Sequence, residues 1–121
     1  MRMAFVQEAV LAMAADGDLG APGAAITVEL CGHWEHRPPC PVAPHHTSAE
    51  RVAGEVRLRT LFATEPDRET TVRQGIELAL ARGELRGPAG PVTRWRLCAC
   101  RSGDVLPAEA DHARRLSAGS P

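Results

Sequence analysis

The chain has 121 residues, of which 14 are basic and 15 acidic, and 44% are hydrophobic. Its net charge of −1 argues against a protein that coats nucleic acid, because such proteins carry a large positive excess. No stretch reaches the roughly 18 apolar residues of a membrane-spanning helix, and the first residues lack the apolar core of a signal peptide. We therefore expect one globular domain that is soluble and cytoplasmic.

The N-terminal part of the sequence predicts a helix followed by a strand. Over 3–16, apolar residues recur at spacings of three and four, as on one helix face: Met3, Val6, Val10 and Met13. The run Asp16-Gly17-Asp18 ends this helix. Apolar and polar residues then alternate over about 26–31, which predicts a half-buried strand.

The segment from Trp34 to about Ala53 contains four prolines and most of the histidines. We expect it to be a long loop, and long loops in compact domains are often functional.

The second half of the chain predicts a strand, a helix and another strand. The strand over about 54–63 has one face that carries Val56, Leu58, Thr60 and Phe62 and another that carries Glu55, Arg57, Arg59 and Leu61. The helix starts at 64–67, ends at Gly83, and buries Val72, Ile76, Ala79 and Leu80. The last strand, over about 92–101, has one face with Trp95, Leu97 and Ala99 and another with Arg94, Arg96, Cys98 and Cys100.

These elements predict an α+β fold, a small single-sheet sandwich with the order α-β-β-α-β and one sheet face open. The arrangement is similar to half of a ferredoxin-like fold, which carries no information about function. Strands 54–63 and 92–101 are joined by a helix and should be parallel, with strand 26–31 antiparallel between them. Residues 1–101 form this domain, and 102–121 form a weakly structured C-terminal tail or a weak helix.

Cysteine and histidine residues cluster in one segment. Of the nine in the chain, six lie within 31–46, where an even distribution would place about one: Cys31, His33, His36, Cys40, His45 and His46. Thiolate and imidazole are the ligands that zinc prefers, and on a strand Cys31 and His33 would share a face. We expect Cys31, His33, His36 and Cys40 to bind zinc, with His45 and His46 as spare ligands.

Other metals fit the same residues. Copper(I) also binds cysteine and histidine, and iron could use two histidines with Glu35. Four protein ligands would make a structural or regulatory site. Three ligands and a water would make a metal-dependent enzyme with Glu35 as base and His45 or His46 as proton shuttle.

Two further features lie on the predicted strands. Cys98 and Cys100 are either partly buried structural thiols or reactive thiols activated by nearby arginines. The open sheet face should carry Glu29, Glu55, Arg57, Arg59, Arg94 and Arg96. Those charges either pair to keep the face in water or bind an anion, an acidic protein or a second copy of the chain.

The predicted function is therefore a small zinc-binding protein with a structural or regulatory role. The alternatives are a metal-dependent enzyme and an interaction module that binds a protein or anion through Arg57, Arg59, Arg94 and Arg96. Nucleic acid is not an expected partner, because an aromatic content of 3% offers few bases a stacking platform.

Overall fold

The computed structural model describes residues 2–31, 43–87 and 90–118, and of Cys31 only the backbone. In chain order the elements are β1 (Met3–Met13), α1 (Ala21–Cys31), β2 (His45–Val52), β3 (Glu55–Thr64), α2 (Glu69–Ala81), β4 (Glu84–Arg86), β5 (Val92–Gly103) and α3 (Ala110–Ala118). Two single 3-10 turns, η1 (Pro66–Arg68) and η2 (Pro107–Glu109), lead into α2 and α3.

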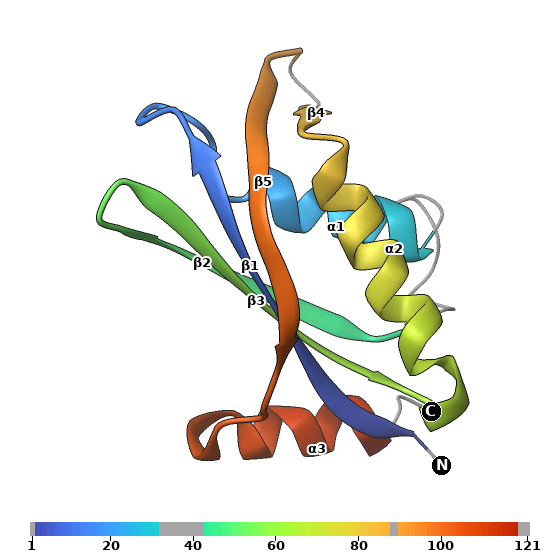
Figure 1. Cartoon of the computed structure of the whole chain (residues 1–121). Helices are drawn as coiled ribbons and strands as arrows, with labels where there is room; N and C mark the ends of the chain where they lie inside the picture. The colour runs from blue at the N-terminus through green and yellow to red at the C-terminus, as the bar shows by residue number, and fades with distance from the viewer. Residues whose placement is uncertain (1, 32–42, 88–89, 119–121) are drawn as a thin grey trace.

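The strands form one five-stranded sheet in the order β2-β3-β1-β5-β4 (Figure 1). Every neighbouring pair is antiparallel, and β1 lies in the centre between β3 and β5. The predicted α+β class with a single sheet is therefore confirmed. The predicted order is wrong, because the described part of the chain starts with a strand and contains the additional strands β2 and β4.

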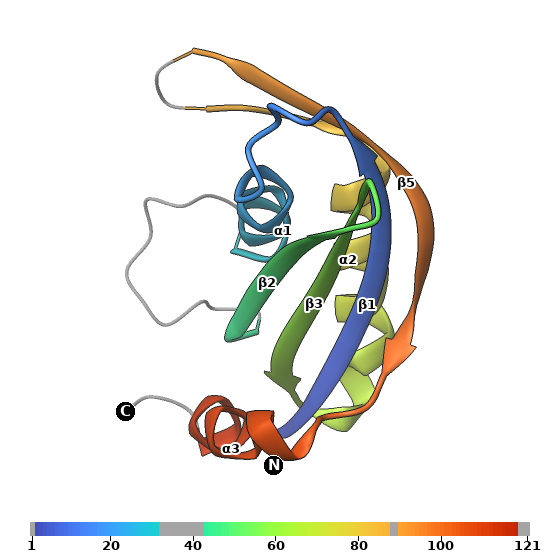
Figure 2. The same ribbon diagram turned by 90° about the vertical axis from the view of Figure 1, so that its left-hand side faces the viewer.

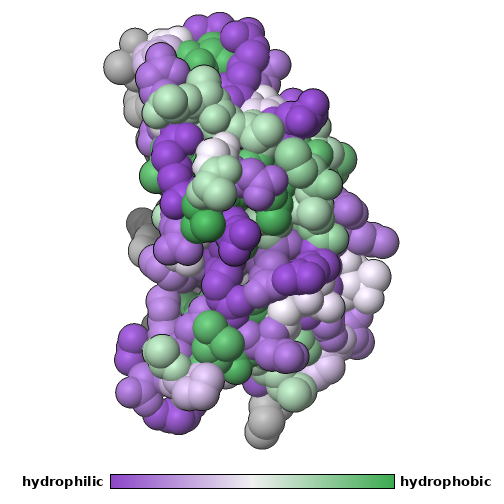
Figure 3. Space-filling model, turned by 60° about the vertical axis from the view of Figure 1, so that its left-hand side comes forward, coloured by the Kyte–Doolittle hydropathy of each residue, from purple (hydrophilic) through white to green (hydrophobic). Residues whose placement is uncertain are grey.

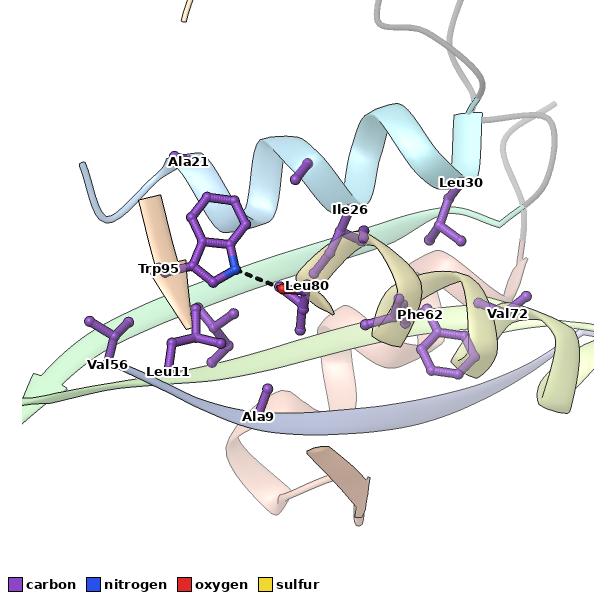
Figure 4. Close-up of a cluster of buried hydrophobic side chains, with 14 of the residues drawn as sticks. Ala9, Leu11, Ala21, Ile26, Leu30, Val56, Phe62, Val72, Leu80 and Trp95 are labelled. Carbon is purple, nitrogen blue, oxygen red and sulfur yellow. Dashed lines mark hydrogen bonds between the residues drawn. The ribbon is translucent and has the colours of Figure 1, made fainter. Parts of the chain in front are cut away.

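The sheet curls around α1 and α2, which cover the same face (Figure 2). The main core fills the space between this face and the two helices, with Leu11, Ile26, Phe62, Ile76 and Leu80 almost completely buried. Trp95 closes one end of the core, and its indole Nε1 donates a hydrogen bond of 2.9 Å to the carbonyl oxygen of Leu80 (Figure 4). We call this side of the sheet the core face.

The opposite side, which we call the open face, is covered by α3 at one end only. There Ala113 and Leu116 pack against Val6 and Leu61 in a second, smaller core. The sequence predicted a weak helix or a loose tail in this region, and the structure has β5 continuing to Gly103 and then a helix on the sheet. Whether residues 1–101 fold without this helix stays a prediction.

The predicted N-terminal helix is wrong, because Met3–Met13 form the central strand. Val6 is buried under α3 on one face and Leu11 under the core on the other, so both faces of this strand are apolar. A strand buried on both faces loses the alternation that identifies strands. Its apolar residues then matched a helical spacing by coincidence.

The predicted strand at 26–31 is also wrong, since these residues belong to α1. Asp18 accepts a hydrogen bond from the backbone N–H of Gly20 just before the helix, and Pro22 occupies its first turn. Ala21, Ala25, Ile26 and Leu30 are buried, which is the spacing of a helix face. The alternation of Ile26, Val28 and Leu30 concealed this pattern.

The predicted loop from Trp34 to Ala53 is wrong in its last part. His45–Val52 form β2, an edge strand that pairs with β3 through a two-residue turn at Ala53 and Gly54, both with positive φ. Polar residues dominate β2, so its composition resembles that of a loop. Residues 34–42 of the predicted loop lie outside the described residues.

The strand over 54–63, its two faces and the helix after it are confirmed. The buried residues of α2 are the four that were predicted. The last strand is confirmed, but beyond Leu97 its residues lie on the opposite faces from those that were predicted. A β-bulge between Val10 and Leu11 leaves Cys98 without a partner, so Cys100 lies on the core face with Trp95 and Leu97 while Ala99 lies on the open face.

Candidate functional site

The open face contains a hollow of about 630 Å³ that spans β1, β2, β3 and β5. Its polar lining consists of Glu8, Ser48, Glu50, Arg57, Arg59 and Arg101. Short side chains, Val10 and Ala99, face each other on neighbouring strands in the middle of this surface. The hollow therefore has a low apolar floor and a rim of long charged side chains. Figure 3 brings the left-hand side of Figure 1 forward and shows hydrophilic residues across its middle.

Strand alternation explains why these residues share a face. Glu8 and Val10 alternate with core residues of β1, and their register partners on β3 are Arg59 and Arg57. Ser48 and Glu50 of β2 are the next partners of the same two arginines. Two rows that run across the sheet therefore line the hollow, each with one residue from β2, β3, β1 and β5: Ser48, Arg59, Glu8 and Arg101 in one row, and Glu50, Arg57, Val10 and Ala99 in the next.

The side chain of Arg59 binds several polar groups. It donates two hydrogen bonds to the Glu109 carboxylate, at 3.1 and 2.8 Å, and a third to the carbonyl oxygen of Asp104 at 2.8 Å. It also forms an ion pair with Glu8, whose other oxygen accepts a hydrogen bond of 3.0 Å from Arg101. The hydrogen bonds between Arg59 and Glu109 raise the pKa of the guanidinium and lower the pKa of the carboxyl.

Arg57 and Arg96 differ from Arg59. Both side chains are exposed, and within the described residues neither has an ion-pair or hydrogen-bond partner. Arg94 lies 4.0 Å from Glu84, the outer limit of an ion pair. Of the four arginines predicted for the open face, Arg57 and Arg96 are thus available to a ligand.

Glu29 was predicted to lie on this face, and that prediction is wrong. Glu29 belongs to α1 and forms an ion pair of 2.8 Å with Arg82, directly after α2. The misassigned strand at 26–31 caused the error. Two other residues of the site were missed from the sequence: Glu8, because β1 was predicted to be a helix, and Arg101, because the bulge in β5 places it on the other face than the predicted alternation does.

The predicted zinc ligands lie mostly outside the described residues. His33, His36 and Cys40 are among the residues not described, and Cys31 is the last residue of α1 rather than part of a strand. His45 and His46 are described and occupy successive positions of β2, so they lie on opposite faces of the sheet. These two histidines therefore cannot bind one ion together without a change in β2.

His45 points to the core face, where both of its ring nitrogens have partners. Nε2 lies 2.9 Å from the hydroxyl of Thr27 on α1, and Nδ1 lies 2.9 Å from the carbonyl oxygen of Ala43. Burial lowers the pKa of His45, and the bond to Ala43 opposes that shift. As a metal ligand, His45 would have to give up one of these hydrogen bonds.

His46 points to the open face and contacts a residue that the sequence did not associate with it. Its imidazole ring and that of His112 on α3 have centroids 5.0 Å apart and planes inclined by 51°. The sequence has no motif around His112, and only the packing of α3 against the sheet brings this residue next to β2.

The described part of the chain contains no group of three or more His, Cys, Asp or Glu side chains placed to hold a metal ion. None of its helices has the length and hydrophobicity of a membrane span. The zinc site at 31–46 therefore stays a prediction.

Cys98 and Cys100 do not share a face. Cys98 is exposed at the bulge, whereas Cys100 is half-buried and accepts a hydrogen bond of 2.9 Å from the side-chain amide of Gln7. Burial raises the pKa of the Cys100 thiol. A raised pKa disfavours the reactive thiolate, so Cys100 fits a structural role better than a catalytic one.

Comparison with protein-family models, with curated proteins and with solved structures finds no match to this chain. The likeness to half of a ferredoxin-like fold consequently stays a prediction, and the function is inferred from the residues themselves.

Proposed function

We propose that this protein is an interaction module that binds an acidic segment of a partner protein in the hollow on its open face. The hollow carries the proposal: its volume of about 630 Å³ lies in the range of roughly 300–1,000 Å³ that is usual for binding sites. A strand or loop of a partner would cover the short floor residues Val10 and Ala99. Its carboxylates would meet the arginines of the rim.

The charges of the rim favour an anionic partner. The lining contains three arginines against two glutamates, and two of the arginines, Arg59 and Arg101, already pair with Glu8, while Arg59 also pairs with Glu109. Arg57 stands in the rim without an ion-pair partner among the described residues, and Arg96 lies further along β5 on the same face. A guanidinium can bind a carboxylate through two parallel hydrogen bonds, which gives it both affinity and orientation.

A titration followed by NMR tests this function. Isotope-labelled protein is titrated with a hexaglutamate peptide, and we expect shifts of the amide signals around Val10, Ser48, Arg57 and Ala99. Arg57→Glu should weaken binding more than tenfold, because it replaces an attraction by a repulsion. Arg68→Glu is the matched control, since Arg68 is exposed on η1 and does not line the hollow. Equal losses in the two variants, or shifts away from the hollow, would exclude the proposal.

A second candidate function, metal binding by residues 31–46, rests on the clustering of cysteine and histidine in that segment. A further observation supports it: the hydrogen bond between Thr27 and His45 joins α1 to β2, the two elements that flank the segment. The ends of the segment are therefore held near each other, which lowers the entropy lost when its side chains converge on an ion. We propose Cys31, His33, His36 and Cys40 as ligands of zinc, with copper and iron as alternatives.

Elemental analysis of the purified protein tests the second candidate. We expect the unmodified chain to keep about one equivalent of zinc through extensive dialysis, and a variant with Cys31→Ala and His33→Ala to keep none. A folded protein that contains no metal at all would exclude this site. Loss of the fold on metal removal would indicate a structural site, and retention of the fold would direct attention to an open coordination position.

A further inference from the structure

His46 and His112 approach each other from two elements that are anchored independently. His46 lies on β2, which pairs with β3 along its whole length. His112 lies on α3, which is held to the sheet by the buried Ala113 and, through the preceding turn, by the bonds between Glu109 and Arg59. The two imidazoles are therefore kept near each other without being bonded to each other.

The separation of the rings fits a shared metal ion. Zinc–nitrogen bonds of about 2.0–2.1 Å place two imidazole centroids about 4.5 Å apart at a bond angle of 90° and about 5.2 Å apart at a tetrahedral angle. The observed separation of the centroids is 5.0 Å, between these two limits.

The surroundings of the two rings suit a cation. His46 is exposed and His112 is half-buried, so an ion can reach both from solvent. Glu109 lies one helical turn before His112 and is close enough to interact with it electrostatically, although Glu109 also pairs with Arg59. No third protein ligand stands beside the pair in the described residues, which leaves the remaining coordination positions to water.

We infer that His46 and His112 form a two-histidine binding site for a divalent transition-metal ion such as zinc. The ion would link α3 to the edge strand β2 and so hold the C-terminal helix on the sheet. This site differs from the one predicted at Cys31, His33, His36 and Cys40: it pairs His46 with His112, and it lies on the face of the sheet opposite to His45. With two protein ligands, its affinity should be lower than that of a closed four-ligand site.

Calorimetry and thermal unfolding with zinc chloride test the inference on metal-free, full-length protein. In a variant with Cys31→Ser and His33→Gln, which removes two of the ligands predicted in the other segment, we expect zinc to give one binding event and a rise in Tm. Adding His46→Gln or His112→Gln to this variant should abolish the event and the rise in Tm. His46→Gln is the safer variant for folding, since this side chain is exposed.

Other results would overturn the inference. Zinc binding that is unchanged in both histidine variants, or lost in only one of them, would mean that the two rings do not share an ion. Zinc binding that is already lost in the variant of Cys31 and His33 would assign the metal to the segment 31–46 instead. Titration with cobalt(II) gives an independent readout, because the paramagnetic ion should broaden NMR signals around positions 46 and 112 first.

Discussion

His45 connects the first helix to the edge strand, and its hydrogen bonds define the tautomer of its neutral ring. A carbonyl oxygen can only accept, so Nδ1 must carry a proton to bond to Ala43. In the neutral ring Nε2 then accepts the hydroxyl proton of Thr27. That hydroxyl also lies 3.2 Å from the carbonyl oxygen of Gly23, and a second proton on the ring would redirect it there. Protonation is thus opposed by burial rather than by a missing partner.

The lowered pKa of His45 predicts a pH-dependent stability. Since the folded chain binds this proton less readily than the unfolded chain, whose histidine titrates near 6.5, protonation favours unfolding. We expect the free energy of unfolding to fall as the pH drops below about 6.5 and to level off below the lowered pKa. Urea unfolding of the unmodified chain and of His45→Gln between pH 5 and 8 measures this, and the variant should show a smaller slope. Equal slopes would contradict the prediction, because the other four histidines are present in both proteins.

At the scale of elements, the junction between α2 and β5 depends on one glycine. Gly83 follows α2 with a φ of +72°, and its carbonyl oxygen accepts a hydrogen bond of 2.9 Å from the N–H of Trp95. A Cβ at position 83 would lie 2.7 Å from the carbonyl oxygen of Trp95, which is backbone and cannot move aside. The hydrogen bond to Gly83 holds the backbone of Trp95 beside the end of α2. The close approach of β5 to this helix therefore requires a glycine at position 83.

Gly83→Ala should therefore destabilise the fold more than Gly54→Ala. Gly54 also has a positive φ, of +83°, but a Cβ there would have no neighbour within 4 Å among the described atoms. Alanine at position 54 should cost about 1–2 kcal/mol for its left-handed conformation alone. At position 83 we expect about 2–4 kcal/mol, since the contact with Trp95 adds to the same strain. Equilibrium urea unfolding of the two variants measures the difference, and equal losses would show that the contact is relieved at no cost.

At the scale of the whole molecule, α3 decides how much of the open face remains open. The helix covers Val6 and Leu61, and Arg59 joins it to the hollow because the same guanidinium binds Glu8 of the rim and Glu109 before α3. The C-terminal helix is therefore coupled to the proposed binding surface. A ligand in the hollow would lie beside Arg59, and a metal ion at His46 and His112 would link α3 to β2. Both would therefore affect how firmly α3 is held on the sheet.

Ending the chain after Gly103 tests whether this helix belongs to the fold. Truncation exposes Val6 and Leu61, each worth about 1.5–3 kcal/mol when fully buried, so the free energy of unfolding should fall by about 3–6 kcal/mol. A chain that ends after Ala118 is the control and should keep the stability of the full chain. Chemical denaturation followed by circular dichroism compares the three proteins. If the shorter chain is as stable as the full one, 102–121 is the dispensable tail that the sequence predicted.

The sequence alone predicted β3, α2 and β5, because α2, β5 and the first half of β3 each bury one face and expose the other. In α2 the apolar residues Val72, Ile76, Ala79 and Leu80 are both the periodic ones and the buried ones. In β3 the arginines Arg57 and Arg59 alternate with core residues, so their place on the open face followed from the pattern. Local periodicity suffices where an element has a polar side and an apolar side.

Only the tertiary structure decided the rest. Residues 3–13 form a strand because the main core covers one of its faces and α3 covers the other. Which residues of β5 beyond Leu97 lie on each face depends on a bulge that a sequence pattern does not reveal. The hollow, the ion pairs of Arg59 and the contact of His46 with His112 all join residues that are far apart in the chain. Their proximity arises from strand order and helix docking, since a period along the chain reports which side of an element is buried but not which other element buries it.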